Sequence, residues 1–350
     1  MTIRPDFPLS AETTLPGLAF AAMRMVMLHQ ARDRDLPVIE DGDSRITLQA
    51  KYGVYSFARV DGGIQLTVSA ERTDWLHTLK DALMEQLGQT VPDSVAAIRW
   101  SDGPSAGSLP PNFHFVTVQS VNPIGTAFLR VRIKGSDLSN FQNDAIHFRV
   151  VLPPKGLRDV EWPYVAENGA TVWPKGDKAL HRPVYTTRWV DQETGLMDFD
   201  VFIHEGGRIT EWVQDLQPGD KVGIVGPGGG GIPDTRNILL YADETAFPAA
   251  ARILEALPDD ARGHATFLAE EGAWCAYPIT APQGVSVTWL SRQEGASLGD
   301  LALQARGDLP DHFLWFACEK SDVQRVRAAY KEAGGAASNA YIAAYWTKMG

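Results

Sequence analysis

Alternating hydrophobic and polar positions in the N-terminal part of the chain predict a small α+β unit. Strands with a two-residue period are expected at residues 46–50, 53–60 and 64–70, and amphipathic helices at 19–32 and 73–87. The Asp61-Gly62-Gly63 sequence between the last two strands is a hairpin-turn signal. We expect these elements to form a first domain over residues 1–104.

Further strand patterns follow, with one short helix among them. The strands are expected at residues 113–121, 128–133, 146–152, 184–190, 197–204 and 221–225, and the helix at 210–216. Many strands with few intervening helices are typical of an antiparallel barrel. The stretch 101–111, rich in Gly, Ser and Pro, is typical of a linker, so a barrel domain is predicted over residues 112–232.

Beyond residue 233 the pattern changes to buried strands that alternate with helices. The strands are expected at residues 237–242, 265–269, 285–290, 313–318 and 340–345, and the helices at 246–256, 299–305 and 322–333. This alternation is typical of a parallel sheet covered by helices. It predicts an α/β domain of the nucleotide-binding type over residues 235–350.

Composition and charge exclude several classes of function. Hydrophobic residues make up 44% of the chain and charged residues 21%, which is ordinary for a globular protein. The formal net charge of −11 argues against binding to nucleic acid or to an anionic membrane surface. The two cysteines, Cys275 and Cys318, cannot form a disulfide framework or a cysteine-rich metal site, and no metal centre is expected.

The N-terminal sequence does not resemble an export signal. It has two prolines and an acid where a signal peptide requires a basic start and an apolar run. The apolar stretch 17–28 is interrupted by Arg24 and is too short to span a bilayer. We therefore expect a cytoplasmic protein with no membrane partner.

The segment R-P-V-Y-T-T at residues 182–187 is the first candidate for chemistry. In an extended chain Tyr185 and Thr187 share one face, and Arg182 can share the other face with Thr186. A cation for a phosphate and a ring that lies flat on an isoalloxazine together suit a flavin. Taken alone, the segment fits an ordinary barrel strand with a surface arginine equally well.

A glycine-rich turn leads into the predicted helix at 210–216. The sequence D-V-F-I-H-E-G-G-R-I-T covers residues 200–210 and contains the candidates His204, Gly207, Ile209 and Thr210. Thr210 or a neighbour could be the helix cap. Free N–H groups and the dipole at a helix start form an anion site, which would suit a flavin pyrophosphate. A plain capped helix is the alternative interpretation, and taken alone it is the favoured one.

The run G-P-G-G-G-G at residues 226–231 formally contains a dinucleotide fingerprint. Pro227 lies inside it, Pro233 follows it, and no helix opens after it, so we reject that interpretation. The run is instead expected to be a flexible junction between the barrel and the α/β domain.

Polar residues follow two strands of the predicted parallel sheet. Asp243, Glu244 and Thr245 follow its first strand, and Cys318 with Glu319 ends a later one. Open α/β sheets bind ligands at this carboxyl edge, although each group alone is more often structural. On a barrel strand, His147 and Arg149 lie two residues apart and so on one face, where the pair could meet an anionic substrate.

Together these motifs resemble the siderophore-interacting proteins, a family of FAD-dependent ferric-siderophore reductases. The resemblance runs from about residue 113 to the C-terminus, and the N-terminal unit lies outside it. It rests on I-H-F-R-V-V-L-P-P at 146–154, V-W-P at 172–174, R-P-V-Y-T-T at 182–187, D-F-D-V-F-I-H-E-G-G at 198–207, P-G-D at 218–220, D-E-T-A at 243–246 and A-Y-W at 344–346. It implies a barrel and an α/β domain like those of ferredoxin reductases.

The resemblance also implies roles for these residues. Tyr185 would lie near the isoalloxazine, with Thr186 and Thr187 bonding its edge or the ribityl chain. The pyrophosphate would be held by Arg182 and by the turn that contains His204, Gly207, Ile209 and Thr210. The nicotinamide approach would be lined by Asp243, Glu244, Thr245, Cys318 and Glu319, with Tyr345 and Trp346 close to the flavin. An anionic ferric chelate would be attracted by Arg149, Arg188 and Lys348.

The sequence departs from the family pattern where relatives have glycine or a basic residue. Ala242 and Cys318 replace glycines and could crowd a nicotinamide, and Gly228 stands where some relatives have a basic residue. Glu270 and Glu271 follow the second α/β strand, where an acid favours a ribose hydroxyl and hence NADH. Arg292 is the best phosphate partner if the donor is NADPH, and a reduced ferredoxin is a third donor.

The expected function is reduction of a ferric siderophore by FAD, with electrons from NADPH, NADH or ferredoxin. Siderophore oxygens hold Fe(III) far better than Fe(II), so reduction releases the iron without a metal site on the protein. One alternative is a general NAD(P)H:flavin or electron-carrier oxidoreductase. Another is a non-catalytic flavin- or siderophore-binding module.

Overall fold

The computed structural model describes residues 7–34, 36–96, 98–103, 106–204 and 206–348. The chain forms two compact units, the first made of Met1–Phe113 with Leu152–His181 and the second of His114–Val151 with Arg182–Gly350. Parts of the sequence interpretation lie outside the described residues: the first six residues, the predicted domain ends at residues 104 and 350, and Glu205 in the second motif.

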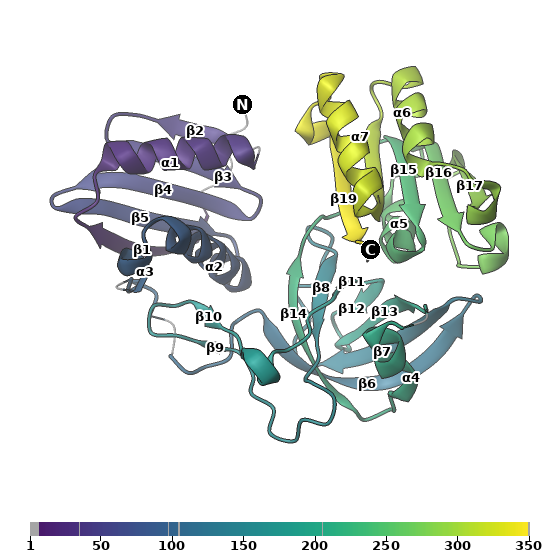
Figure 1. The fold of residues 1–350 in the computed structure, drawn as a ribbon, viewed down its shortest axis with the longest axis horizontal. Helices are drawn as coiled ribbons and strands as arrows, with labels where there is room; N and C mark the ends of the chain where they lie inside the picture. Colours follow the sequence, from purple (N-terminus) through teal and green to yellow (C-terminus); the bar gives the residue numbers. More distant parts are fainter. Residues whose placement is uncertain (1–6, 35, 97, 104–105, 205, 349–350) are drawn as a thin grey trace. The chain divides into compact units, whose positions relative to one another are not determined.

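The first unit is built on a five-stranded antiparallel sheet of order β1-β5-β4-β3-β2 (Figure 1). Its strands are β1 (Leu9–Pro16), β2 (Val38–Asp41), β3 (Arg45–Ala50), β4 (Gly53–Val60) and β5 (Gly63–Ala70). The helices α1 (Phe20–Asp33) and α2 (Thr73–Thr90) share one hydrophobic core with the sheet, and α3 (Pro92–Ala96) follows. Strand β2 was not predicted because all four of its residues are exposed, so no alternation marks it.

The segment between the barrel strands β8 (His147–Val151) and β11 (Val184–Thr186) packs with the first unit, whereas the sequence placed it in the barrel. It carries a hairpin of β9 (Tyr164–Val165) and β10 (Thr171–Val172). The backbone N–H of Thr171 donates to Asp81 Oδ1 at 2.8 Å, and its Oγ1 lies 2.8 Å from His77 Nε2. The polar side of α2 therefore supplies the contacts that bind this segment to the first unit.

The second unit begins with a seven-stranded sheet of order β11-β8-β14-β6-β7-β13-β12. Its further elements are β6 (Phe113–Ile124), β7 (Phe128–Gly135), β12 (Trp189–Asp191), β13 (Leu196–Phe202), α4 (Arg208–Asp215) and β14 (Lys221–Gly228). The single strand expected at 184–190 is in fact two strands, β11 and β12. The N–H of Thr187 donates to Ile146 O and that of Arg188 to Asp198 O, both at 2.8 Å. The chain thus passes directly from β11, at one end of the strand order, to β12, at the other end, and this connection closes the barrel.

A five-stranded parallel sheet of order β17-β16-β15-β18-β19 completes the unit. The strands are β15 (Asn237–Asp243), β16 (Arg262–Ala269), β17 (Gly284–Ser291), β18 (Phe313–Glu319) and β19 (Ala340–Trp346). Helix α5 (Phe247–Ala256) packs on one face, and α6 (Leu298–Asp308) with α7 (Lys320–Glu332) on the other. The strand order reverses between β15 and β18, which is the switch point where such sheets bind ligands.

The glycine run at 226–231 is closely packed, contrary to the expectation of a flexible junction. A Cβ on Gly230 would lie 2.7 Å from Tyr341 Cε2, and one on Gly231 would lie 2.4 Å from the carbonyl oxygen of Asp144. Glycine is required here because the backbone passes too close to β19 and to the residues before β8. Within the described residues, no helix combines the length and the apolar character that crossing a membrane requires.

Candidate functional site

Strand β11 carries the first group of candidate residues. Its antiparallel register with β8 places Val184 opposite Arg149, Tyr185 opposite Phe148 and Thr186 opposite His147. Tyr185 is half-buried, with its ring 5.5 Å from that of Phe199, and burial raises the pKa of its hydroxyl. The hydroxyl therefore stays protonated at neutral pH and can donate a hydrogen bond.

Thr187 does not lie on the same strand face as Tyr185, because β11 ends at Thr186. Its side chain is buried, and its Oγ1 has no hydrogen-bond partner among the residues that the structure describes. Its carbonyl oxygen accepts a hydrogen bond from Arg252 on α5. Thr187 is thus held at the barrel closure, with one buried hydroxyl left for a further partner.

His147 connects the barrel to the last strand of the α/β sheet. Its Nδ1 lies 3.3 Å from Thr186 Oγ1 and its Nε2 lies 3.1 Å from the hydroxyl of Tyr345. The imidazole and the Tyr345 ring meet edge to face at 5.6 Å. His147 is buried while Arg149, two residues on, is exposed, so only Arg149 is open to an anionic substrate.

Two exposed arginines lie together beside β11. Arg149 Nη1 donates to the carbonyl oxygen of Arg182 at 2.8 Å. Partial burial, followed by the positive charge of Arg149, lowers the pKa of Arg182. The structure therefore brings the predicted phosphate partner and the predicted substrate contact into one positively charged surface.

The other two predicted substrate contacts, Arg188 and Lys348, have acidic partners on the α/β domain. Arg188 forms a bidentate pair with Glu255 of α5, at 2.6 and 2.5 Å, and its side chain is only 10% exposed. Lys348 is exposed, and its backbone N–H donates to Glu319 Oε1 at 3.1 Å. The same carboxylate caps the first turn of α7 through Ser321, so Glu319 organises two segments at this edge.

The glycine-rich turn leads into helix α4, which begins two residues before the predicted start. Its N-cap is Gly207, which has no side chain to cap the first N–H groups. The prediction left the cap open between Thr210 and a neighbour; the cap is Gly207, and Thr210 Oγ1 instead accepts the N–H of His204 at 3.3 Å. A Cβ on Gly207 would lie 2.6 Å from His204 Cε1, so a larger residue here would displace the imidazole. Ile209 and Thr210 are buried behind it.

Asp243 joins the ends of the first and last strands of the α/β sheet. Its Oδ1 accepts the N–H and the hydroxyl of Thr245, at 3.1 and 2.6 Å, and its Oδ2 accepts the indole N–H of Trp346 at 2.6 Å. The side chain is buried, and this burial raises its pKa to about 6. Tyr345 and Trp346 are consecutive, so one short segment contacts both the barrel and this edge.

Glu244 and Arg292 connect the ends of β15, β16 and β17. Glu244 is buried, and its Oε1 accepts the N–H of Glu270 at 2.8 Å. Its Oε2 accepts a hydrogen bond from Arg292, whose Nε lies 3.6 Å from Glu270 Oε2. The guanidinium remains 39% exposed, so it holds two carboxylates and still has a face toward solvent.

The two side chains that replace family glycines point into the cores on opposite faces of the sheet. Ala242 is buried in the core on the α5 side, and Cys318 in the core on the side of α6 and α7. Burial raises the pKa of the Cys318 thiol, so it stays protonated at neutral pH. Neither side chain extends beyond the strand ends, and the predicted crowding of a nicotinamide therefore finds no support.

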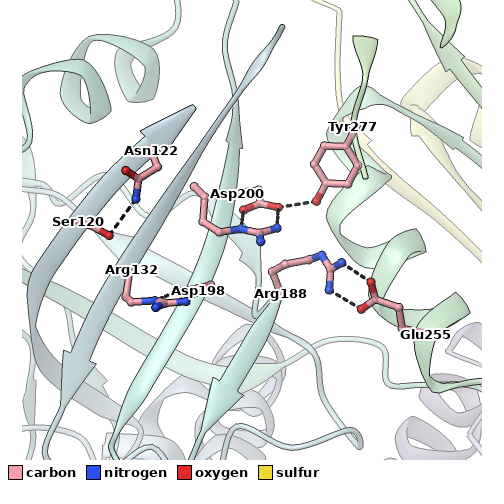
Figure 2. Close-up of polar contacts among 9 residues, drawn as sticks. Ser120, Asn122, Arg132, Arg188, Asp198, Asp200, Glu255 and Tyr277 are labelled. Atoms are coloured by element: carbon pink, nitrogen blue, oxygen red, sulfur yellow. Dashed lines mark hydrogen bonds and ion pairs between the residues drawn. The ribbon is translucent and has the colours of Figure 1, made fainter. Parts of the chain in front are cut away.

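A polar network between the barrel and α/β sheet was missed in the sequence (Figure 2). Arg130 of β7 forms a bidentate pair with Asp200 of β13, and the hydroxyl of Tyr277 donates to the same carboxylate. Arg252 of α5 donates to Thr187 O and Asn143 Oδ1. The alternation Arg130/Arg132 against Asp198/Asp200 could have indicated the cross-strand pairs, but nothing in the sequence indicated that Tyr277 of the α/β domain contacts Asp200.

The raised pKa of Asp243 predicts a titration near pH 6. The folded pKa of about 6 exceeds the ordinary value of 3.8, so the folded protein binds this proton more tightly than the unfolded chain. The stabilisation is therefore full below about pH 4 and is lost as the pH rises to about 6. We expect the fluorescence of Trp346, taken as the difference between the wild type and Trp346→Phe, to titrate with a midpoint near 6. Persistence of that titration in Asp243→Asn would contradict the assignment.

A barrel followed by a parallel sheet with a switch point defines the ferredoxin-reductase class of flavoproteins. A ferredoxin reductase of carbazole 1,9a-dioxygenase superposes on this chain with a TM-score of 0.50 at 14% identity, covering 68% of this chain and 69% of its own, which shows a shared fold alone. The predicted order of barrel and α/β domain is confirmed.

Sequence comparisons define the family. Residues 117–231 match the siderophore-interacting FAD-binding domain, and residues 235–349 match the siderophore-interacting protein model. The NADPH-dependent ferric-chelate reductase of Escherichia coli (strain K12) is 32% identical over 238 residues, or 62% of this chain and 91% of that protein. A siderophore utilization protein from T. fusca superposes with a TM-score of 0.57 at 29% identity, covering 69% of this chain and 95% of its own. This chain belongs to the siderophore-interacting protein family, as its motifs predicted.

Proposed function

We propose that this protein is an FAD-dependent ferric-siderophore reductase that draws its electrons from NADPH. One observation carries the proposal beyond family membership. Tyr345 lies 3.1 Å from His147 next to β11, and the adjacent Trp346 donates to Asp243 at the carboxyl edge of β15. The flavin segment of the barrel and the donor edge of the α/β sheet therefore meet at two consecutive residues.

The residues of the barrel fit FAD. The start of α4, whose N-cap Gly207 has no side chain, would direct backbone N–H groups toward a pyrophosphate, in a turn where a larger residue would crowd His204. The buried hydroxyl of Thr187 lacks a partner among the described residues, and the protonated hydroxyl of Tyr185 can donate. Bound FAD would supply the chemistry, accepting a hydride and releasing electrons singly. The protein would orient it and exclude water from its reactive side.

The donor edge supports NADPH over NADH. Arg292 presents an exposed guanidinium at the end of β17, next to the end of β16. In sheets of this topology the ribose of the adenosine half binds there, and an arginine accommodates a 2′-phosphate. The similar Escherichia coli protein is named as NADPH-dependent. Glu270, which suggested NADH in the sequence, lies 3.6 Å from Arg292 and is partly neutralised by it.

The substrate is proposed to be an anionic ferric siderophore that approaches Arg149 and Arg182. These exposed cations lie side by side in a chain whose formal net charge is −11. A local positive surface attracts an anion despite a negative total charge, and it raises the rate of encounter. The proposed compartment is the cytoplasm, in keeping with two buried cysteines that form no disulfide.

Anaerobic stopped-flow spectroscopy tests the function. The protein is loaded with FAD, photoreduced without nicotinamide and mixed with a ferric catecholate or a ferric hydroxamate. We expect flavin reoxidation by at least one chelate to be at least about tenfold faster than with buffer, which requires roughly 1.4 kcal/mol of barrier lowering. Equal rates with chelate and buffer would refute the proposal. Faster reoxidation by free flavin or quinone than by either chelate would instead support a general oxidoreductase.

A further inference from the structure

Trp274 is the most exposed of the described large hydrophobic side chains, at 83%. It lies in the short turn η3 (Gly272–Cys275), which follows the carboxyl end of β16. Tryptophan is highly buried on average, and a ring left this open to water does not contribute to a core. Gly272 and Cys275 at the two ends of the turn are buried, so the turn is anchored, while Ala273 and the indole of Trp274 are exposed.

Contacts on both sides hold this turn in place. Before it, the carbonyl oxygen of Glu270 accepts a hydrogen bond from the hydroxyl of Ser291 at 3.1 Å. After it, the carbonyl oxygen of Cys275 accepts the N–H of Thr126 at 3.1 Å, and Tyr277 is bound to Asp200. The exposure of the indole is therefore a property of an anchored turn.

The backbone after Trp274 is strained. Ala276 has a φ of +51° in the left-handed region, which is costly for a residue with a Cβ, and it is the only described non-glycine residue with a positive φ. Such strain persists only where the surrounding structure imposes it, and it often marks a ligand-binding segment. Here it ends the turn between Trp274 and the buried Tyr277.

The turn packs against Ser291, the residue that precedes Arg292. Gly272 approaches Ser291, which precedes Arg292, to the extent that a Cβ on Gly272 would lie 3.5 Å from Ser291 Cβ. Arg292 in turn contacts Glu270, two residues before Gly272. An exposed aromatic plane and an exposed cation thus stand at the ends of two adjacent parallel strands.

We propose that Trp274 is the stacking platform for the adenine ring of the nicotinamide donor, with Arg292 taking the 2′-phosphate. This inference rests on the proposed function for the identity of the donor. Aromatic stacking on a base contributes enough binding that truncation to alanine should weaken an adenosine ligand by about tenfold. The ligand recognised at this edge is therefore an adenosine 2′-phosphate.

Titration calorimetry with adenosine 2′,5′-bisphosphate tests the inference on the FAD-loaded protein. We expect Trp274→Ala to raise the Kd by about tenfold and Trp274→Phe by less than about threefold, because phenylalanine retains a stacking plane. Leu301→Ala serves as the matched control, since it removes an exposed side chain from α6, and its Kd should be unchanged. An unchanged Kd in Trp274→Ala would overturn the inference.

A ligand without adenine separates stacking from a general change in the turn. Reduced nicotinamide mononucleotide should reduce the flavin of the wild type and Trp274→Ala at equal rates, and an equal loss for it and NADPH would overturn the inference. The reoxidation of photoreduced flavin by a ferric chelate requires no adenosine ligand. Its failure in the wild type would refute the proposed function, while the calorimetry would still decide the role of Trp274.

Discussion

Replacing Asp200 by alanine is expected to lower the free energy of unfolding of the second unit by about 3–5 kcal/mol. The Asp200 carboxylate is buried, forms two hydrogen bonds with Arg130 at 2.7 and 2.8 Å, and accepts another from Tyr277. Its removal leaves the guanidinium of Arg130, only 27% exposed, and the buried hydroxyl of Tyr277 without that acceptor. A buried group that loses its partner costs far more than an exposed one.

Urea unfolding, monitored by tryptophan fluorescence with FAD saturating in every sample, measures the effect. Asp198→Ala is the matched control. Asp198 lies two residues before Asp200 on β13 and makes the same kind of bidentate pair with Arg132, but Arg132 is 43% exposed. It should cost about 1 kcal/mol, and Tyr277→Phe a similar amount. If Asp200→Ala and Asp198→Ala lower the free energy of unfolding equally, the greater burial of Arg130 and Tyr277 does not set the cost.

Replacing Arg292 by alanine is expected to lower kcat/KM for NADPH by about 100-fold, which corresponds to about 2.7 kcal/mol of lost transition-state binding. Arg292 is the cation that faces solvent at the ends of β16 and β17, where the 2′-phosphate is proposed to bind. NADH has no 2′-phosphate, so its kcat/KM should change by less than about threefold. Flavin reduction by each donor, followed by anaerobic stopped flow, gives both constants.

Glu270→Gln should act in the opposite direction. Glu270 lies 3.6 Å from Arg292 and is 63% exposed, so it competes with a phosphate for the same guanidinium. Its neutralisation should raise the ratio of kcat/KM for NADPH to kcat/KM for NADH by about threefold, since exposed charge pairs contribute little.

For Arg292→Ala, the rate of flavin reduction by NADH also reports whether the substitution disturbs the buried Glu244. If kcat/KM falls equally with NADPH and NADH, the substitution disturbs the structure of the strand ends, and Arg292 is not the phosphate partner.

Much of the candidate site could be predicted from local sequence. Tyr185, Thr186 and Gly207 could be proposed as site residues because a strand, a turn and a helix start each leave a short pattern. The carboxyl edge with Asp243 and Cys318 followed from the alternation of strands and helices, which places these ends together whatever the loops do. The sequence left the cap of α4 open between Thr210 and a neighbour, because a hydroxyl near a helix start can also bind the preceding strand end, as Thr210 does.

The residues that were missed are those whose roles depend on distant partners. Arg252 and Glu255 belong to α5, yet their contacts are with Thr187 and Arg188 of the barrel. Tyr277 occupies an irregular segment after η3, and only the folded chain brings it to Asp200. No local pattern encodes such pairs, because sequence separation is unrelated to which surfaces meet.

The sequence by itself determined the order of the barrel and the α/β domain, the presence of a short helix after the glycine-rich turn, and the family of this protein. These features depend on hydrophobic periods and short motifs, which act over a few residues. Only the tertiary structure decided that residues 184–190 form two strands that close the barrel, that 152–181 packs with the first unit, and that Tyr345 and Trp346 connect barrel and donor edge. Those outcomes depend on backbone and side-chain partners that are distant in the sequence. Packing in the folded chain selects these partners, and a local sequence pattern does not specify them.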